Sequence, residues 1–386
     1  MKQKKINILV FITHSLSEIN VLYPLFAELS KEGGFKISVV FTVRKIYGQY
    51  MKDEYYRYCE DRLGIKTYMC HLPNKFDKNL DKLYLLPFGN GMRKYFITLW
   101  TYFKLPNLIT KLILSDIYMH EFSDRRESTR LLYLGQVLMR KRILTYHHGS
   151  EISIDKTASP CKNNSGKRTI LIFHHHNSMY MKKKGYSRQA VIGYPIFFPE
   201  WKKIVNEYPG GEFSRRSIIL IYSRHVVERY MDPEKYDFLL RSTLRVLRKK
   251  FGNIPIVIKP HPREDIRLIN EIVKKQEISD VKISFEHPAV LAKNARIAIA
   301  FWGSVVLESL SMEVPTVEYY IEARRFREDY PSGSNYKAVG IHAVSNEQEL
   351  EDFVNSVLKK NYKFPTILDE FNRGKDIQIF KKPIVE

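Results

Sequence analysis

Two loops in the second half of the sequence carry residues that suit a phosphate group. The first is Lys259-Pro260-His261-Pro262-Arg263, which follows an apolar, strand-like run. The prolines restrict the backbone on both sides of the histidine and so preset the direction of its imidazole. The cationic side chains suit a phosphate or a developing oxyanion, and the imidazole can donate a hydrogen bond or give a proton to a departing nucleotide. The alternative interpretation is a rigid proline turn with a solvated histidine.

The second loop is Gly303-Ser304, which comes directly after another strand-like run and opens an amphipathic helical pattern. Free backbone N–H groups at the start of a helix attract anions, and Ser304 is a residue type that commonly caps a helix. Glu308 lies one turn further on and could face a ribose or act as an acidic first-turn residue. Helix capping alone is the alternative explanation of the Gly-Ser pair.

The elements that must position these loops alternate between strands and helices. An apolar run at 6–13, a helical pattern at 19–32 and a run rich in β-branched residues at 36–42 predict a strand, a helix and a parallel strand. Further strands are predicted at 116–119, 143–146 and 169–174. A second alternating series runs from 217 to 319 and is followed by a terminal helix at 346–359.

This alternation predicts an α/β protein with two Rossmann-like domains that face a cleft. We expect an N-terminal, acceptor-side domain at 1–205, a nucleotide-donor-binding domain at 206–345, and a C-terminal helix and tail at 346–386. Pro199, Pro209, Gly210 and Gly211 break the pattern around 200–216 and predict the interdomain linker there. Ligands of such sheets bind at the carboxyl ends of the strands, which is where both phosphate-type loops lie.

The strand with its Lys-Pro-His-Pro loop, followed further along by Gly-Ser-Val-Val-Leu-Glu-Ser, resembles the C-terminal half of GT-B glycosyltransferases. It is most similar to those that use cytidine nucleotides: bacterial sialyltransferases and polysialyltransferases, capsule Kdo transferases and the CDP-glycerol transferases of teichoic acid synthesis. The resemblance covers residues 217–320. It implies that His261 contacts the donor phosphate and acts as an acid, that Ser304 holds the same phosphate, that Glu308 faces the ribose, and that no metal is needed.

Inverting transfer also requires a base that deprotonates the acceptor hydroxyl, which we expect from the N-terminal half. Glu121 and Asp124 follow a strand-like run and are the first candidates, although a charged helix start explains them equally well. His14, after the first strand, is a second candidate on the acceptor side. His148, in a His-Gly pair similar to one in CDP-glycerol transferases, is another. Arg224, at the end of the first strand of the second series, could bind a phosphate or a sugar carboxylate.

The tract His174-His175-His176 has the composition of a metal site. Because adjacent residues on a strand point to opposite faces, three consecutive histidines on the predicted strand would not share one ion, and we expect no metal site here.

The net charge of +21 favours an anionic partner: nucleic acid, acidic lipid headgroups or a phosphorylated or carboxylated small molecule. A lysine-rich surface without a partner is the alternative. No recognised nucleic-acid module, P-loop or Gly-x-Gly-x-x-Gly pattern occurs, and three cysteines favour a reducing compartment. The aromatic and basic segment 84–115 is interpreted as core-facing helices or as a surface that rests on a membrane.

The sequence therefore predicts a metal-independent inverting glycosyltransferase. We expect it to transfer a sugar from a CMP-sialic-acid-like or CMP-Kdo donor to a surface glycan or glycolipid, as in capsule or lipopolysaccharide synthesis. A CDP-glycerol or polyol-phosphate transferase and a UDP-sugar transferase of the same fold stay open, as does a basic binding protein without catalysis. The expected location is the cytoplasm, with peripheral attachment to the inner face of the membrane.

Overall fold

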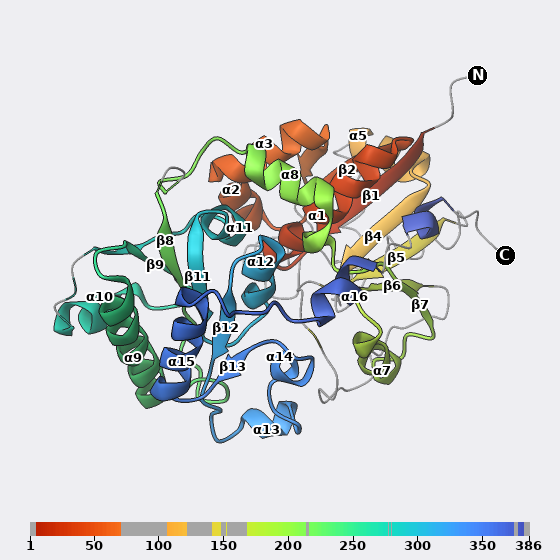
Figure 1. The fold of residues 1–386 in the computed structure, drawn as a ribbon. Helices are drawn as coiled ribbons and strands as arrows, with labels where there is room; N and C mark the ends of the chain where they lie inside the picture. The colour runs from red at the N-terminus through yellow and green to blue at the C-terminus, as the bar shows by residue number, and fades with distance from the viewer. Residues whose placement is uncertain are drawn as a thin grey trace, which may run out of the picture.

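The computed structural model describes residues 5–70, 106–121, 141–147, 152, 168–213, 216–276, 278, 280–373 and 377–381. These residues form two separate parallel β-sheets, which lie side by side in Figure 1 with the first on the right and the second on the left. The prediction of two Rossmann-like α/β domains is confirmed. The predicted helical or interfacial segment 84–115 falls mostly outside the described residues.

The first sheet has the strand order β3-β2-β1-β4-β5-β6-β7. Its central strand β1 is apolar and almost wholly buried, as expected for a strand covered on both faces. Strand order reverses at β1, because the chain first builds outward to β2 and β3 and then returns to β4 on the other side. The strands are β1 (Ile6–Ile12), β2 (Phe35–Phe41), β3 (Lys66–Met69), β4 (Ile117–Glu121), β5 (Arg142–Tyr146), β6 (Thr169–Ile172) and β7 (Arg188–Val191).

Seven helices of the first domain fall among the described residues, and α1 contacts α3, α8 and the short 3-10 helix η2. They are α1 (Ser17–Glu32), α2 (Arg44–Lys52), α3 (Glu54–Leu63), α5 (Pro106–Leu114), α7 (His176–Lys183), η2 (Pro195–Phe197) and α8 (Pro199–Glu207).

Helix α8 corrects the predicted linker, which was placed at 200–216. Pro199 begins this helix, a position where the missing N–H of proline costs nothing. Trp201, Ile204 and Val205 are buried at helical spacing against the first domain. Between the end of α8 at Glu207 and the start of β8 at Ile218, the described residues form no helix or strand. Only this part of the predicted linker is irregular.

The second sheet has the order β10-β9-β8-β11-β12-β13, and every pairing in it is parallel. Strand order again reverses at the first strand of the unit, β8. The strands are β8 (Ile218–Tyr222), β9 (Ile256–Lys259), β10 (Val281–Ile283), β11 (Ala295–Ala300), β12 (Thr316–Tyr319) and β13 (Ala343–Val344).

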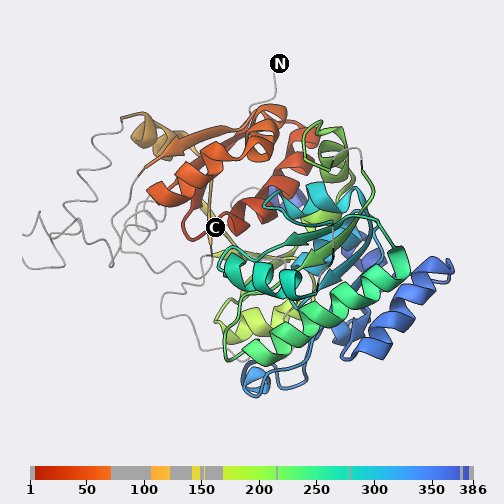
Figure 2. The same cartoon turned by 90° about the vertical axis from the view of Figure 1, so that its left-hand side faces the viewer.

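Helices α9 and α15 of the second domain pack against each other and are seen together in Figure 2. Helix α9 begins after Asp232, whose carboxylate accepts a hydrogen bond from the N–H of Lys235. The helices here are α9 (Pro233–Phe251), α10 (Ile266–Lys275), α11 (Pro288–Ala292), α12 (Val305–Ser311), α13 (Phe326–Asp329), α14 (Asn335–Ala338) and α15 (Glu347–Leu358).

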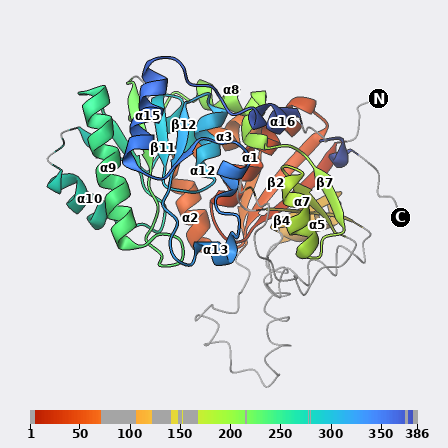
Figure 3. The same ribbon diagram turned by 60° about the horizontal axis from the view of Figure 1, so that its bottom comes forward.

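Buried apolar residues of the two domains belong to one continuous cluster. At the contact between the domains, the imidazole of His287, just before α11, is completely enclosed by the aromatic rings of Tyr55, Tyr56 and Trp201. Its Nε2 lies 3.2 Å from Oδ1 of Asn20 in the first turn of α1. The domains are therefore packed together, as the turned view in Figure 3 also shows.

The chain returns to the first domain after α15. In helix α16 (Ile367–Arg373), Phe371 is fully buried against Tyr194 and Phe197 of the first domain. In the short helix η3 (Ile377–Phe380), Phe380 packs on Phe35 at the start of β2.

Candidate functional site

The point at which strand order reverses in the first sheet carries a histidine–carboxylate pair. His14 follows the carboxyl end of β1, and Glu121 ends the neighbouring strand β4. Nε2 of His14 lies 3.2 Å from Oε2 of Glu121. The histidine side chain is 37% exposed, whereas the glutamate side chain is fully buried. A buried carboxylate thus orients an imidazole that solvent or a substrate can reach.

A second buried carboxylate fixes the loop that carries His14. Glu18, at the start of α1, accepts hydrogen bonds from the backbone N–H groups of Thr13, His14 and Ser15 and from the hydroxyl of Tyr146. Burial raises the pKa of Glu18 above its ordinary value, although these hydrogen bonds favour the carboxylate. The loop after β1 is therefore rigidly held relative to β5, and with it the position of His14.

The corresponding reversal point in the second sheet carries a cation on an aromatic ring. Arg224 follows β8, and Trp302 follows the adjacent strand β11. The guanidinium carbon lies 4.3 Å from the centre of the indole ring. Trp302 has a φ of 59°, a left-handed conformation that costs a non-glycine residue on the order of 1–3 kcal/mol. Contacts with Tyr230, Tyr320 and Phe326 hold the indole in this conformation.

The proline-flanked loop after β9 lies beside Arg224. The ring of His261 stacks on that of His225 at a centroid distance of 4.2 Å. Glu264 holds the loop, because its carboxylate accepts hydrogen bonds from the N–H of His261 and from the hydroxyls of Ser223 and Tyr236. The loops after β8 and β9 are thus joined by one buried carboxylate.

Burial shifts the pKa values of two residues in this cluster. Burial, helped by His225 and three neighbouring cations, lowers the pKa of His261 to about 3, so its imidazole is neutral near pH 7. Nδ1 of His261 accepts a hydrogen bond from the N–H of Arg263, which leaves the proton of the neutral ring on Nε2. Burial also lowers the pKa of Lys259 to about 8, although Asp53 and Glu264 oppose the shift.

The loop after β11 differs from the sequence prediction in one respect. Ser304 occupies the N-cap position of α12 with helical backbone angles, but its side chain makes no capping hydrogen bond. Gly303 has a φ of 138°, and a Cβ there would lie 3.3 Å from Nη1 of Arg224. This φ is what requires glycine, and the approach of the arginine leaves little room for a side chain as well.

Glu308 is a buried acid inside α12. Burial raises its pKa to about 8, which keeps the carboxyl neutral at pH 7. Its Oε2 accepts no hydrogen bond from any described residue. A neutral carboxyl with an unused oxygen can accept a hydrogen bond from a ligand hydroxyl.

The two clusters lie close to the contact between the domains. Asp53, which caps α3 in the first domain, is near enough to Lys259 to shift its pKa, and Tyr56 interacts electrostatically with Glu308. Asn20, which contacts His287, lies in the same α1 turn as Glu18. Elements that follow the carboxyl ends of strands in both sheets therefore meet across this contact.

The predicted site residues that the structure describes lie in two groups, one in each domain. The structure brings His14 and Glu121 together in the first domain, and Arg224, Gly303 and the His261 loop together in the second. Pro262 and Arg263 lie on the exposed side of that loop. Asp124 and His148 lie outside the described residues.

Sequence reasoning missed Glu18, Tyr146, His225, Trp302 and Asp53 as parts of these clusters. His225 and Trp302 stood directly beside predicted site residues, so the strand-end rule could have found them. Glu18 and Asp53 looked like ordinary helix-start residues, and only the fold shows what they contact.

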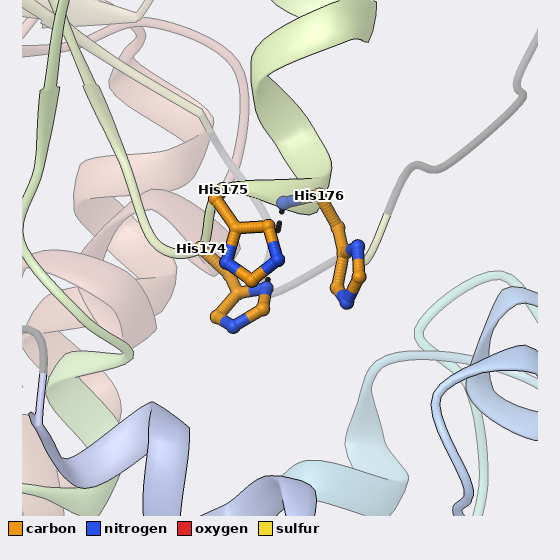
Figure 4. A group of neighbouring side chains, drawn as sticks. All are labelled: His174, His175 and His176. Carbon is orange, nitrogen blue, oxygen red and sulfur yellow. Dashed lines mark hydrogen bonds between the residues drawn. The ribbon is translucent and has the colours of Figure 1, made fainter.

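The histidine tract corrects another expectation. Strand β6 ends at Ile172, His174 and His175 occupy the turn that leads into α7, and His176 begins that helix, so none of the three lies on a strand. Their rings are gathered together (Figure 4), and one nitrogen of each lies within 4.8 Å of those of the others. The argument that strand geometry separates these side chains is therefore wrong.

No helix among the described residues has the length and apolar character needed to cross a bilayer.

Comparisons with known proteins identify the fold. No protein-family model and no curated protein sequence matches the chain. Solved structures do match along nearly the whole length. A glycosyltransferase from Rickettsia africae is 15% identical, with a TM-score of 0.55 and 98% of each chain covered. The UDP-GlcNAc 2-epimerase from Methanocaldococcus jannaschii is 14% identical, with a TM-score of 0.55, covering 96% of this chain and 97% of that one. TcCGT1 in complex with UDP is 10% identical, with a TM-score of 0.52 and coverage of 92% and 90%. These similarities establish a GT-B-like fold.

Proposed function

We propose that this GT-B-like chain is an inverting glycosyltransferase that uses a nucleotide-activated sugar. One observation carries the proposal: the reversal point of each sheet is occupied by a reactive cluster. His14 with Glu121 lies at one, and the cationic group around Arg224 and His261 lies at the other. Open α/β sheets bind their ligands at such points, and a transferase needs an acceptor site and a donor site together.

On the acceptor side, His14 is the general base. Its exposed imidazole takes the proton of the acceptor hydroxyl, and the buried Glu121 carboxylate stabilises the imidazolium that forms. Glu18 positions His14 through the loop backbone. This assignment changes the order of the sequence candidates, with Glu121 supporting the histidine rather than acting as the base itself.

On the donor side, protein cations offset the charge of the departing nucleotide. The Nε2–H of His261 donates to the donor phosphate, with Lys259 and Arg224 beside it. The negative charge of the bound phosphate favours a protonated imidazole, so His261 can also pass its proton to the phosphate oxygen of the departing CMP as the bond to the sugar breaks. Ser304 hydrogen-bonds the same phosphate, and Glu308 accepts from a ribose hydroxyl.

For the donor we propose a cytidine nucleotide, of the CMP-sialic-acid or CMP-Kdo type, and a surface glycan as the acceptor. The resemblance of the His261 and Gly303 loops supports this choice over a CDP-glycerol or UDP-sugar donor. Thermal denaturation with CMP, CDP and UDP separates these donors, because a bound ligand raises the midpoint. Stabilisation by UDP alone would reject the cytidine assignment.

The roles of the two clusters are tested by comparing His14→Ala with His261→Ala. Loss of the base lowers kcat by about 10²–10⁴-fold and leaves cytidine nucleotide binding intact. Loss of His261 weakens nucleotide binding and lowers transfer as well. Transfer is measured by acceptor glycosylation, and binding by calorimetry.

His342→Ala is the matched control, since this histidine lies away from both clusters and bonds the carbonyl of Lys363. Undiminished transfer by His14→Ala would reject the base assignment. Conversion of a donor sugar to its epimer without transfer to any acceptor would reject the glycosyltransferase itself in favour of an epimerase.

A further inference from the structure

Three imidazoles and a carboxylate converge where the C-terminal segment meets the first domain. His174 and His175 lie in the turn before α7 and His176 begins that helix, and their ring centroids lie 3.9–4.5 Å apart. Oε2 of Glu370, on α16, lies 3.1 Å from Nε2 of His174. Figure 4 shows the three rings lying next to one another. The proposed transfer reaction assigns no role to these residues.

The turn geometry is what allows consecutive histidines to gather. The N–H of Asn177 bonds the carbonyl of His174, and the N–H of Ser178 bonds the carbonyl of His175, so the backbone coils tightly here. Within the tract, the backbone N–H of His176 donates a long hydrogen bond of 3.4 Å to Nδ1 of His174. A hydrogen bond of this length is weak, so it holds Nδ1 of His174 only loosely.

The spacing of the nitrogens fits a transition-metal ion after small side-chain rotations. Tetrahedral zinc with Zn–N bonds of about 2.0–2.1 Å places its ligand atoms about 3.4 Å from one another. One nitrogen from each histidine already lies within 4.8 Å of the other two. Imidazole nitrogen suits zinc, nickel and cobalt, and a carboxylate bonded to a ligand histidine fixes its ring orientation.

The support around the site is rigid. His174 is buried, and its ring packs on Phe371 of α16 at 5.3 Å. Phe371 is itself fully buried against Tyr194. Glu370 is therefore held next to the histidines by the helix that carries it, and an ion bound there would tie α16 to the first domain.

We propose that His174, His175 and His176, with Glu370 as the carboxylate partner of His174, bind a divalent transition-metal ion that fastens α16 to the turn before α7. The ion is structural, and its site is distinct from the donor and acceptor clusters. The proposal is independent of the glycosyltransferase assignment.

The test is zinc binding by the full chain, prepared without an affinity tag and stripped with a chelator. We expect a single tight zinc site by calorimetry, and a Co²⁺ derivative with the intense visible bands of tetrahedral coordination. Zinc should also raise the unfolding temperature and slow hydrogen exchange in residues 367–373.

The double variant His175→Ala/His176→Ala removes ligands that are exposed or half-buried, so it is expected to fold. It should bind zinc at least about tenfold more weakly and lose the zinc-dependent protection of α16. Glu370→Gln should weaken binding less. His342→Ala again serves as the control that leaves zinc affinity unchanged.

Equal zinc affinity in the wild-type chain and the double variant would overturn the proposal, and so would the absence of zinc binding in the wild-type chain. Transfer activity plays no part in these measurements, so they test the metal site independently of the proposed reaction.

Discussion

At the scale of single residues, burial sets the chemistry of the donor cluster. His261 is neutral because desolvation and surrounding cations oppose its protonation, so it acts first as a hydrogen-bond donor. Lys259 is charged at pH 7 but loses its charge at a slightly higher pH, because its pKa has fallen to about 8. Glu308 is neutral for the same reason, since burial disfavours the charged form and therefore raises the pKa of an acid. The residue types were visible in the sequence, but these protonation states depend on neighbours that only the fold supplies.

The shifted pKa of Lys259 predicts how donor binding depends on pH. An amine is cationic below its pKa and neutral above it, so attraction for the donor phosphate is lost as pH rises through about 8. We expect nucleotide affinity to fall several-fold between pH 7 and pH 9. In Lys259→Arg the charge persists throughout this range, and the fall should disappear. Calorimetric titrations across the range measure both.

Lys282→Arg is the control for this experiment. Lys282 is an exposed partner of Glu212, so its replacement should leave the pH profile unchanged. A wild-type affinity that stays constant from pH 7 to pH 9 would remove Lys259 from the phosphate site.

At the scale of elements, periodicity in the sequence located most strands of both sheets within a few residues. β1, β2 and β5 were each displaced by a residue or so at one or both ends. Helix α8 was missed because its first residue is a proline, which was interpreted as a break. The histidine turn was missed because an apolar run was extended past its true end at Ile172. The misplaced end of β6 is therefore what led to the wrong expectation for the histidine side chains.

The pairing of His14 with Glu121 could not be predicted from spacing. The two residues belong to strands far apart in the sequence, and only the sheet order makes β1 and β4 neighbours. Each was predicted separately, from its place after a strand. The residues were thus available from the sequence, whereas their partnership required the topology.

The turn after β11 gives a prediction at this scale. Gly303→Ala places a Cβ 3.3 Å from Nη1 of Arg224 and forces alanine into a φ of 138°. We expect nucleotide affinity to fall about tenfold, with a loss of stability of about 1–3 kcal/mol. Calorimetry and urea denaturation measure the two effects.

Gly340→Ala is the control for a positive-φ glycine, because Gly340 has a φ of 82° but no atom lies within 4 Å of the added Cβ. It should lose stability and retain nucleotide affinity. If Gly303→Ala bound the nucleotide as tightly as Gly340→Ala, the arginine position would not matter for binding.

At the scale of the whole molecule, the two sheets present equivalent positions to one another. Both reverse their strand order at the first strand, and both carry their reactive groups there. This repetition explains why a sequence pattern alone predicted the two-domain architecture. The net charge of +21 is also a property of the whole chain and suits anionic partners.

The charge predicts peripheral attachment to anionic membranes. We expect the chain to cosediment with vesicles that contain phosphatidylglycerol at low salt and to be released as salt screens the attraction. Zwitterionic vesicles are the control and should not retain it. A chain that stays in the supernatant with anionic vesicles at low salt would contradict membrane attachment.

The return of the C-terminal segment to the first domain constrains how the protein can move. Lys381 pairs with Glu32, and Arg142 donates to the carbonyl of Phe380, so the second domain is connected to the first at two places along the backbone. With two connections, the second domain can rotate relative to the first about the axis that passes through both, but it cannot rotate freely about a single connection. Admission of a donor and release of a product would then use the same swinging motion, with α16 as one of its pivots.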